Sequence, residues 1–111
     1  MGRDKASDLL PGTLDLLILK TLVGGAMHGY AVAQHLRDVS DEVLQVGESS
    51  LYPALQRLLL QGWVKGEWGA SENNRRARYY TLTATGKKRL GAERAEFEKL
   101  VFAIQRVLEM A

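Results

Sequence analysis

The last quarter of this 111-residue sequence carries an apolar stripe at helical spacing that has no partner elsewhere in the chain. Leu90, Phe97, Ile104 and Ala111 are seven residues apart, and Leu100, Val101, Val107 and Leu108 fill the positions between them. Such a repeat predicts a helix that packs along another helix. We therefore expect residues 84–111 to be a C-terminal dimerisation helix that pairs with a second copy, carried by one domain over residues 9–83.

A second apolar segment, residues 14–23, ends at Gly24-Gly25 and is apolar almost all the way round. A helix of this kind must be covered on more than one side, so we expect part of it to join the dimer contact. The predicted dimer interface is Leu14, Leu17, Leu90, Phe97, Leu100, Val101, Ile104, Val107 and Leu108. Residues 1–8 are polar and are predicted to form a flexible arm. A second helix is expected after His28-Gly29-Tyr30, with Val32, Ala33, Leu36 and Val39 turned inward.

The segment GESSLYPALQRLLLQGWV, residues 47–64, predicts a short amphipathic helix with an unusual front end. Its buried stripe is Leu51, Leu55, Leu58 and Leu59, and its other side carries Ser50, Pro53, Ala54, Arg57 and Gln61. With Ser49 or Ser50 as N-cap, Pro53 falls in the first turn, where its missing N–H costs little. Gly62 supplies the stop.

Two strands are predicted to follow, at residues 63–68 and 78–82, joined by a polar loop into a hairpin. Trp63 and Trp68 fall on opposite faces of the first strand, so at most one of them belongs to the core. Thr83 or Thr85 can cap the final helix. Helix, helix, capped helix and hairpin is the order of a winged helix-turn-helix, which makes the fold α+β and mostly helical.

Charge is more informative in its distribution than in its net value of +2. Six basic residues and no acidic one lie between residues 75 and 89: Arg75, Arg76, Arg78, Lys87, Lys88 and Arg89. We expect positive potential at one end of the fold, as for a partner that is a nucleic acid.

In a winged helix the third helix enters the DNA major groove, and here the 47–64 helix takes that place. Its first-turn hydroxyls and free N–H groups can bind phosphate, whereas Tyr52 and Pro53 can touch base edges or thymine methyl groups. Arg75 and Arg76, at the end of the hairpin loop, can reach phosphates or the minor groove. The predicted DNA-binding residues are Ser49, Ser50, Tyr52, Pro53, Arg57, Arg75, Arg76, His28 and Tyr30.

Other classes of function find little support in the sequence. It has no cysteine, no signal-peptide-like start and no apolar run of spanning length, so a cytoplasmic protein without a membrane partner is expected. His28 and His35 have no third ligand, so no metal is expected, and His28 should cap the second helix or meet a phosphate beside Tyr30. No nucleophile with a base, carboxylate pair or phosphate loop stands out, so we expect neither enzyme activity nor a cofactor.

The sequence resembles the PadR-like transcriptional regulators from Leu10 to about Met110. The resemblance is carried by residues 10–14 (LPGTL), 28–30 (HGY), 50–55 (SLYPAL) with Leu58, 62–64 (GWV) and 78–83 (RYYTLT) with Gly86. It implies a dimeric bacterial repressor that binds a palindromic operator in double-stranded DNA, with the C-terminal helix packed on the partner subunit. It also implies a small aromatic effector beside Phe97, which stands where multidrug-binding members carry tryptophan.

Two alternatives remain at the level of the sequence. Phe97 on an apolar stripe is by default a dimer-packing residue, and a winged helix can also be a protein-protein interaction module without operator binding. The second alternative differs from a DNA reader in its response to salt, because each neutralised phosphate releases counterions.

Overall fold

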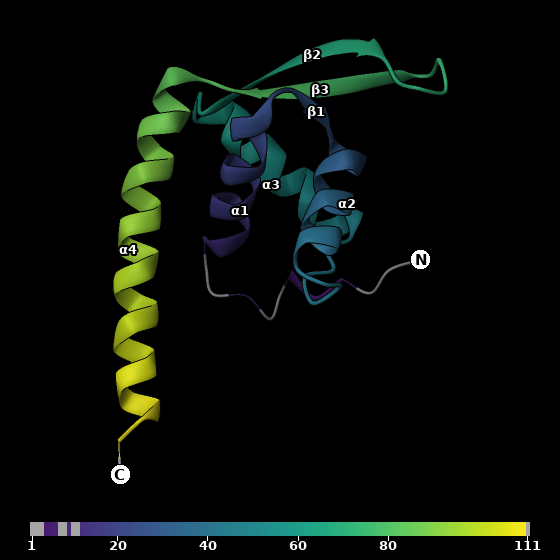
Figure 1. Ribbon diagram of the computed structural model, residues 1–111. Coiled ribbons are helices and arrows are strands. Elements are labelled where there is room, and N and C mark those ends of the chain that lie inside the picture. The colour runs from purple at the N-terminus through teal and green to yellow at the C-terminus, as the bar shows by residue number, and fades with distance from the viewer. Residues whose placement is uncertain (1–3, 7–8, 10–11, 111) are drawn as a thin grey trace.

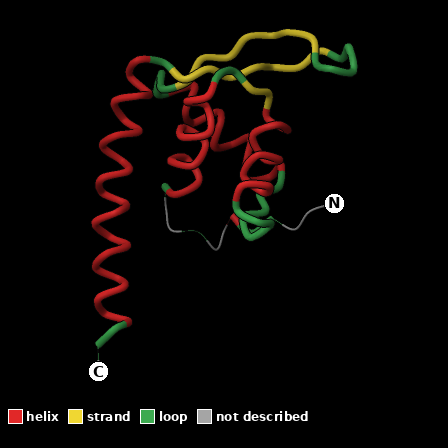
Figure 2. Tube along the Cα trace, viewed as in Figure 1, coloured by secondary structure: helices red, strands yellow, loops and turns green. Residues whose placement is uncertain are grey.

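The computed structural model describes residues 4–6, 9 and 12–110. Its elements are α1 (Thr13–Thr21), a 3₁₀ turn η2 (Leu22–Gly24), β1 (Met27–His28), α2 (Gly29–Val39), α3 (Glu48–Leu60), β2 (Val64–Ala70), β3 (Arg76–Leu82) and α4 (Ala84–Leu108). The strands form one antiparallel sheet in the order β1-β3-β2. α1, α2 and α3 pack on one face of this sheet, and α4 starts at the base of the β2-β3 hairpin and extends past them (Figure 1). Figure 2 shows the sheet as a separate layer above the helices.

The core lies between the sheet and the first three helices, and α1 is at its centre. Ile18 and Leu19 are fully buried and pack with Leu55 and Leu58 of α3. α1 contacts α2, α3 and α4, so the chain itself covers it on more than one side. Leu14, predicted at the dimer interface, is 9% exposed and belongs to this core.

The start of α3 differs from the prediction. Its N-cap is Gly47, whose carbonyl accepts the N–H groups of Ser50 and Leu51, so a serine N-cap is wrong. Pro53 is therefore the sixth residue of the helix and lies in its second turn, where the carbonyl of Ser49 loses its helical partner. This loss is tolerated because Pro53 is on the exposed side of the helix.

Two predictions about which side chains face the core are also wrong. Ala54 is fully buried, because it follows Leu51 by three residues and precedes Leu58 by four and so shares their stripe. Val39 is exposed at the last position of α2. The predicted stop of α3 is confirmed: Gly62 follows the helix with a left-handed φ of 75°.

The hairpin is confirmed and is longer than predicted, with β2 running to Ala70 and β3 starting at Arg76. β1 was not predicted, since two residues are too few to show a recognisable strand pattern. Trp63 is half-buried against the core whereas Trp68 is 60% exposed, so one tryptophan packs on the core, in line with the prediction that at most one does. Thr83 is the N-cap of α4 and accepts the N–H of Gly86 at 3.0 Å.

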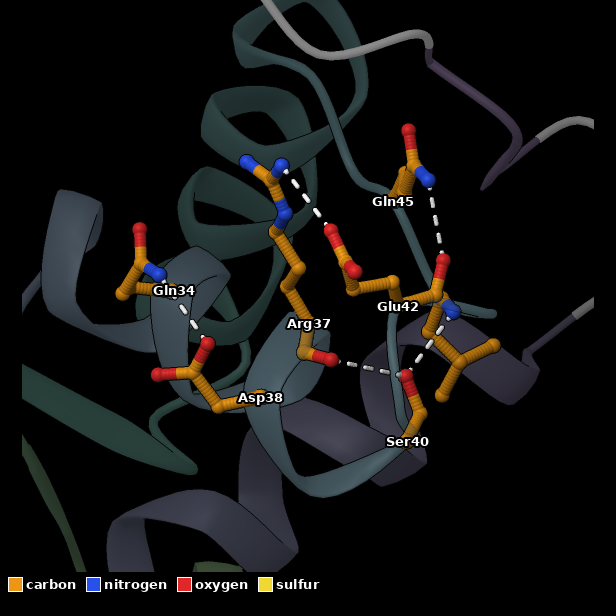
Figure 3. A network of polar contacts seen from close by, with 7 residues as sticks. Gln34, Arg37, Asp38, Ser40, Glu42 and Gln45 are labelled. Atoms are coloured by element: carbon orange, nitrogen blue, oxygen red, sulfur yellow. Dashed lines mark hydrogen bonds and ion pairs between the residues drawn. The ribbon is translucent and has the colours of Figure 1, made fainter.

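The turn between α2 and α3 is fixed by a small polar network (Figure 3). Ser40 Oγ accepts the N–H of Leu44 at 2.8 Å and donates to the carbonyl of Arg37. The Arg37 guanidinium reaches Glu42 at 3.2 Å, and the Gln45 amide donates to the Glu42 carbonyl at 2.9 Å. These bonds hold the connection in one shape and so set the angle at which α3 leaves α2.

The second half of α4 projects beyond the other helices with apolar side chains in solvent. The stripe that carries Leu90 against the core continues on the same helix face through Leu100, Ile104, Val107 and Leu108, all of which are exposed. Ala111 of the predicted seam lies outside the described residues, as do residues 1–3 and 7–8 of the predicted arm. Within the described part of the chain, no helix has both the length and the apolar content to span a membrane.

Candidate functional site

The exposed face of α3 is where the predicted DNA-reading residues lie. Ser49, Tyr52 and Pro53 are exposed at its front. Gln56, exposed one turn further, follows Tyr52 by four residues and lies at the middle of the same face. Gln56 was not among the predicted DNA-binding residues, although its helical spacing of seven residues from Ser49 places both on one face. A side-chain amide in this place can bond the edge of a base.

Tyr52 is positioned by the start of α2. Its ring lies against Gly29, the middle residue of the His-Gly-Tyr motif, and Tyr52 remains 44% exposed. Burial, followed by the neighbouring Glu48 carboxylate, raises the pKa of the Tyr52 hydroxyl above its usual value. Tyr52 therefore presents a neutral hydroxyl group at physiological pH.

His28 caps α2, which confirms one of its two predicted roles. The Ala31 N–H donates to His28 Nδ1 at 3.2 Å. The His28 ring meets Tyr79 of β3 edge-on at 5.5 Å and stacks with Tyr30 at 6.4 Å. Tyr30 itself is 69% exposed, so the DNA contact predicted for it is sterically open.

Arg57 occupies a different environment from the other predicted DNA-binding residues of α3. Its guanidinium donates to the Asp15 carboxylate of α1 at 2.7 Å, and this hydrogen bond raises the pKa of Arg57 further. The pair ties α3 to α1 and neutralises the arginine charge. Arg57 lies at the edge of the exposed face, on the side of α1.

The two serines of α3 are joined by a residue from the N-terminal segment. Ser49 Oγ and Ser50 Oγ each donate to Asp4 Oδ2 at 2.7 Å, and the backbone N–H of Lys5 donates to the Gln45 carbonyl at 2.8 Å. A carboxylate thus lies at the N-terminus of α3, where hydroxyls and free N–H groups favour an anion. Sequence reasoning missed Asp4, since a contact across 45 residues leaves no local signal.

The Asp4 carboxyl is expected to titrate near pH 2. Its pKa is lowered from 3.8 to about 2 because the ionised form accepts the Ser49 and Ser50 hydrogen bonds. A depressed pKa means that the contact stabilises the fold above pH 3.8 and is lost as the pH falls through about 2. Side-chain carboxyl shifts measured by NMR across pH check this. Ser49→Ala/Ser50→Ala should return the pKa toward 3.8, and a value near 3.8 in the unaltered chain would contradict the contact.

The basic run does not form one positive end, and that prediction is wrong. β3 carries the chain from the loop to the base of the hairpin, so the two halves of the run separate (Figure 1). Arg75 is at the loop, with Arg76 and Arg78 on the adjoining part of β3, whereas Lys87 and Lys88 lie in the first turns of α4. The loop is closed by Ser71, whose N–H donates to the Arg75 carbonyl at 2.7 Å.

The described residues contain no group of three or more histidine or acidic side chains able to hold a metal ion. The exposed front of α3 carries hydroxyl and amide groups, with the Asp4 carboxylate held by Ser49 and Ser50. Hydroxyl and amide groups suit the recognition of phosphates and base edges.

Comparisons with known proteins agree with this geometry. A family model described as the transcriptional regulator PadR-like family matches residues 18–92. The fold is similar to a transcriptional regulator from Clostridium thermocellum, with 31% identity, a TM-score of 0.81 and coverage of 89% of this chain and 96% of that one. It is also similar to a PadR family transcriptional regulator from Eggerthella lenta, with 29% identity, a TM-score of 0.77 and coverage of 90% and 85%. An uncharacterised protein of Lysinibacillus sphaericus is 27% identical over 106 residues, covering 93% of this chain and 97% of its own.

Proposed function

We propose that this chain, which belongs to the PadR-like family of transcriptional regulators, is a dimeric repressor of a palindromic operator. Members of the family regulate transcription and are not enzymes, so the chain is a DNA-binding transcription regulator. The observation that carries the finer proposal is the pairing of two surfaces on one short chain. An exposed helix front can enter DNA, and an apolar stripe on α4 needs a second copy.

In this proposal α3 lies in the major groove. Tyr52, Pro53 and Gln56 face the bases, while Ser49 and Ser50 and the free N–H groups of the helix meet a phosphate. Tyr30 and the cap of α2 lie beside the neighbouring phosphate, and Arg75 follows the strand on the far side of the groove. Arg57, paired with Asp15, serves to orient α3 and makes no base contact of its own.

The dimer follows from α4. Its exposed stripe of Leu100, Ile104, Val107 and Leu108 pairs with the same stripe of a second copy, with Phe97 and Val101 completing the seam. A two-fold axis then presents two copies of α3 to one face of the duplex, so the operator has two inverted half-sites about one helical turn apart, roughly 34 Å. Binding in this way occludes promoter DNA, which makes repression the expected outcome.

Phe97 has two roles in the proposal. It is half-buried on the face of α4 that turns toward the body, and the dimer seam continues from it. A small aromatic effector that stacks on Phe97 would enter between the two α4 helices and alter their spacing. Since half-site spacing is set by the dimer, such a ligand would release the operator.

The proposal is tested by DNA binding of Arg75→Ala/Arg76→Ala across a salt series, measured by fluorescence anisotropy. Each lost phosphate contact should make the slope of log K against log salt shallower by about 0.9. The slope of the double variant should therefore be shallower by about twice this amount. Lys99→Ala/Arg106→Ala removes the same charge from the outer face of α4 and should keep the slope of the unaltered chain. Identical slopes for both double variants would contradict a DNA contact by the hairpin loop.

Asp4→Asn is expected to tighten DNA binding by about fivefold at low salt, the size of one exposed charge interaction. The substitution removes a carboxylate that holds the Ser49 and Ser50 hydroxyls and repels an incoming phosphate. Asp38→Asn makes the same chemical change on the outer side of α2 and should leave the affinity unchanged. Equal affinity of the Asp4 variant and the unaltered chain would show that no phosphate reaches the front of α3.

A further inference from the structure

The inner face of the β2-β3 hairpin continues beyond the helical body as a row of aromatic and arginine side chains. Side chains of paired residues share a face, and the pairs Val64–Leu82 and Gly66–Tyr80 bring Val64, Leu82 and Tyr80 onto the core. The next pair on the same face is Trp68–Arg78, followed by Arg76 opposite Ala70. This row therefore faces the side of the sheet on which α3 packs.

The Arg78 guanidinium lies near two aromatic rings. Its Cζ lies 6.0 Å from the ring centroid of Trp68 and 6.0 Å from that of Tyr80. Gly66 of β2 lies beneath the Arg78 side chain. A Cβ on Gly66 would lie 2.5 Å from Arg78 Nε, so only glycine at this position leaves the Arg78 side chain in place. Arg78 Nε is shielded from solvent and has no hydrogen-bond partner among the described residues.

Arg76 stacks on the same indole, with Cζ 4.5 Å from the Trp68 centroid. The ion pairs of the described residues include neither Arg76 nor Arg78, so no acidic side chain in that part of the chain neutralises either charge. Trp68 is 60% exposed, so part of its indole ring lies in solvent beside the two arginines. Stacking restrains two long side chains in advance and lowers the entropy lost when they bind.

We propose that Trp68 is a positioning residue that holds Arg76 and Arg78 as a two-guanidinium clamp for the DNA backbone. The two guanidinium groups bind consecutive phosphates of the DNA strand beside the groove that α3 enters. The DNA contact thereby extends from the tip of the loop along the hairpin. Planar guanidinium groups suit this task because they bind phosphate through two parallel hydrogen bonds. The inference rests on the proposed function, to which it adds two residues, Trp68 and Arg78, that the sequence analysis did not assign to DNA.

The test is a salt series of operator binding for Arg78→Gln, Trp68→Leu and Trp68→Phe. Arg78→Gln should weaken binding about tenfold and make the salt slope shallower by about 0.9. Trp68→Leu should weaken binding to a similar degree, and Trp68→Phe, which keeps an aromatic support, should recover most of the loss. Lys65→Ala, which removes a cation from the outer face of the same strand, is the control and should bind as the unaltered chain does.

A double-mutant cycle separates positioning from a structural role. In an Arg76→Ala/Arg78→Gln background, Trp68→Leu should have no further effect on affinity. An equal loss in both backgrounds would overturn the positioning role. Unaltered affinity and slope in Trp68→Leu and Arg78→Gln would overturn the clamp while leaving the proposed function standing. Absence of DNA binding by the unaltered chain would overturn both.

Discussion

Ile104→Asp is expected to convert the proposed dimer into a folded monomer that no longer binds the proposed operator. Ile104 is 39% exposed in the single chain, so an aspartate there can be solvated in the monomer. In the proposed dimer, the two-fold axis would bring two such carboxylates into an apolar seam, and a buried unpaired charge costs about 3–5 kcal/mol per copy. Sedimentation at micromolar concentration measures the change of state, and circular dichroism verifies that the fold is kept.

Ala95→Asp is the matched control for this substitution. Ala95 is exposed on the same helix, at nine residues from Ile104 and thus on the opposite face. The control adds the same charge and should remain a dimer with full DNA affinity. A dimer of the Ile104 variant with the stability of the unaltered chain would show that α4 does not form the interface.

Gly86→Ala is expected to destabilise the fold by about 2 kcal/mol or more, although alanine is the better helix former by about 1 kcal/mol. A Cβ on Gly86 would lie 2.0 Å from the carbonyl oxygen of Trp63 and 2.7 Å from Leu82 Cδ1. That carbonyl also accepts the N–H of Thr83, so the clash falls on the junction of hairpin and α4. Relief requires α4 to shift, which would misplace the dimer seam and weaken DNA binding as well.

Gly91→Ala provides the contrast within the same helix. No atom lies within 4 Å of the Cβ position at Gly91, so the ordinary helix preference should act alone and stabilise the fold by about 0.5–1 kcal/mol. Urea unfolding of both variants gives the two free-energy changes. Changes of the same sign at Gly86 and Gly91 would contradict the close packing of α4 on the hairpin base.

Elements with local signals were predictable from the sequence. Thr83 caps α4 because its hydroxyl is three residues from Gly86, and the stripe of α4 is set by a seven-residue spacing. The leucine stripe of α3 and its end at Gly62 are equally local. These signals act within one or two turns of the chain and therefore survive any tertiary arrangement.

The rest of the site depends on residues that meet only after folding. Asp4 reaches Ser49 and Ser50 across 45 and 46 positions, and the Arg57–Asp15 pair spans 42. The environment of Arg78 depends on the register of β2 and β3, because Gly66, Trp68 and Tyr80 surround Arg78 only in the observed pairing. The basic run was misjudged for the same reason: an extended strand separates residues that are close in sequence.

Specific binding of an operator by two copies of the chain can be measured in a single experiment. It is the fluorescence anisotropy of DNA from immediately upstream of the chain's own coding region, titrated against a shuffled duplex over a salt series. We expect a preference of about 10³-fold or more for the upstream DNA, two chains per duplex and steep weakening of binding with salt. Absence of binding at low salt, or equal affinity for the two duplexes, would contradict operator binding and favour a protein-interaction module.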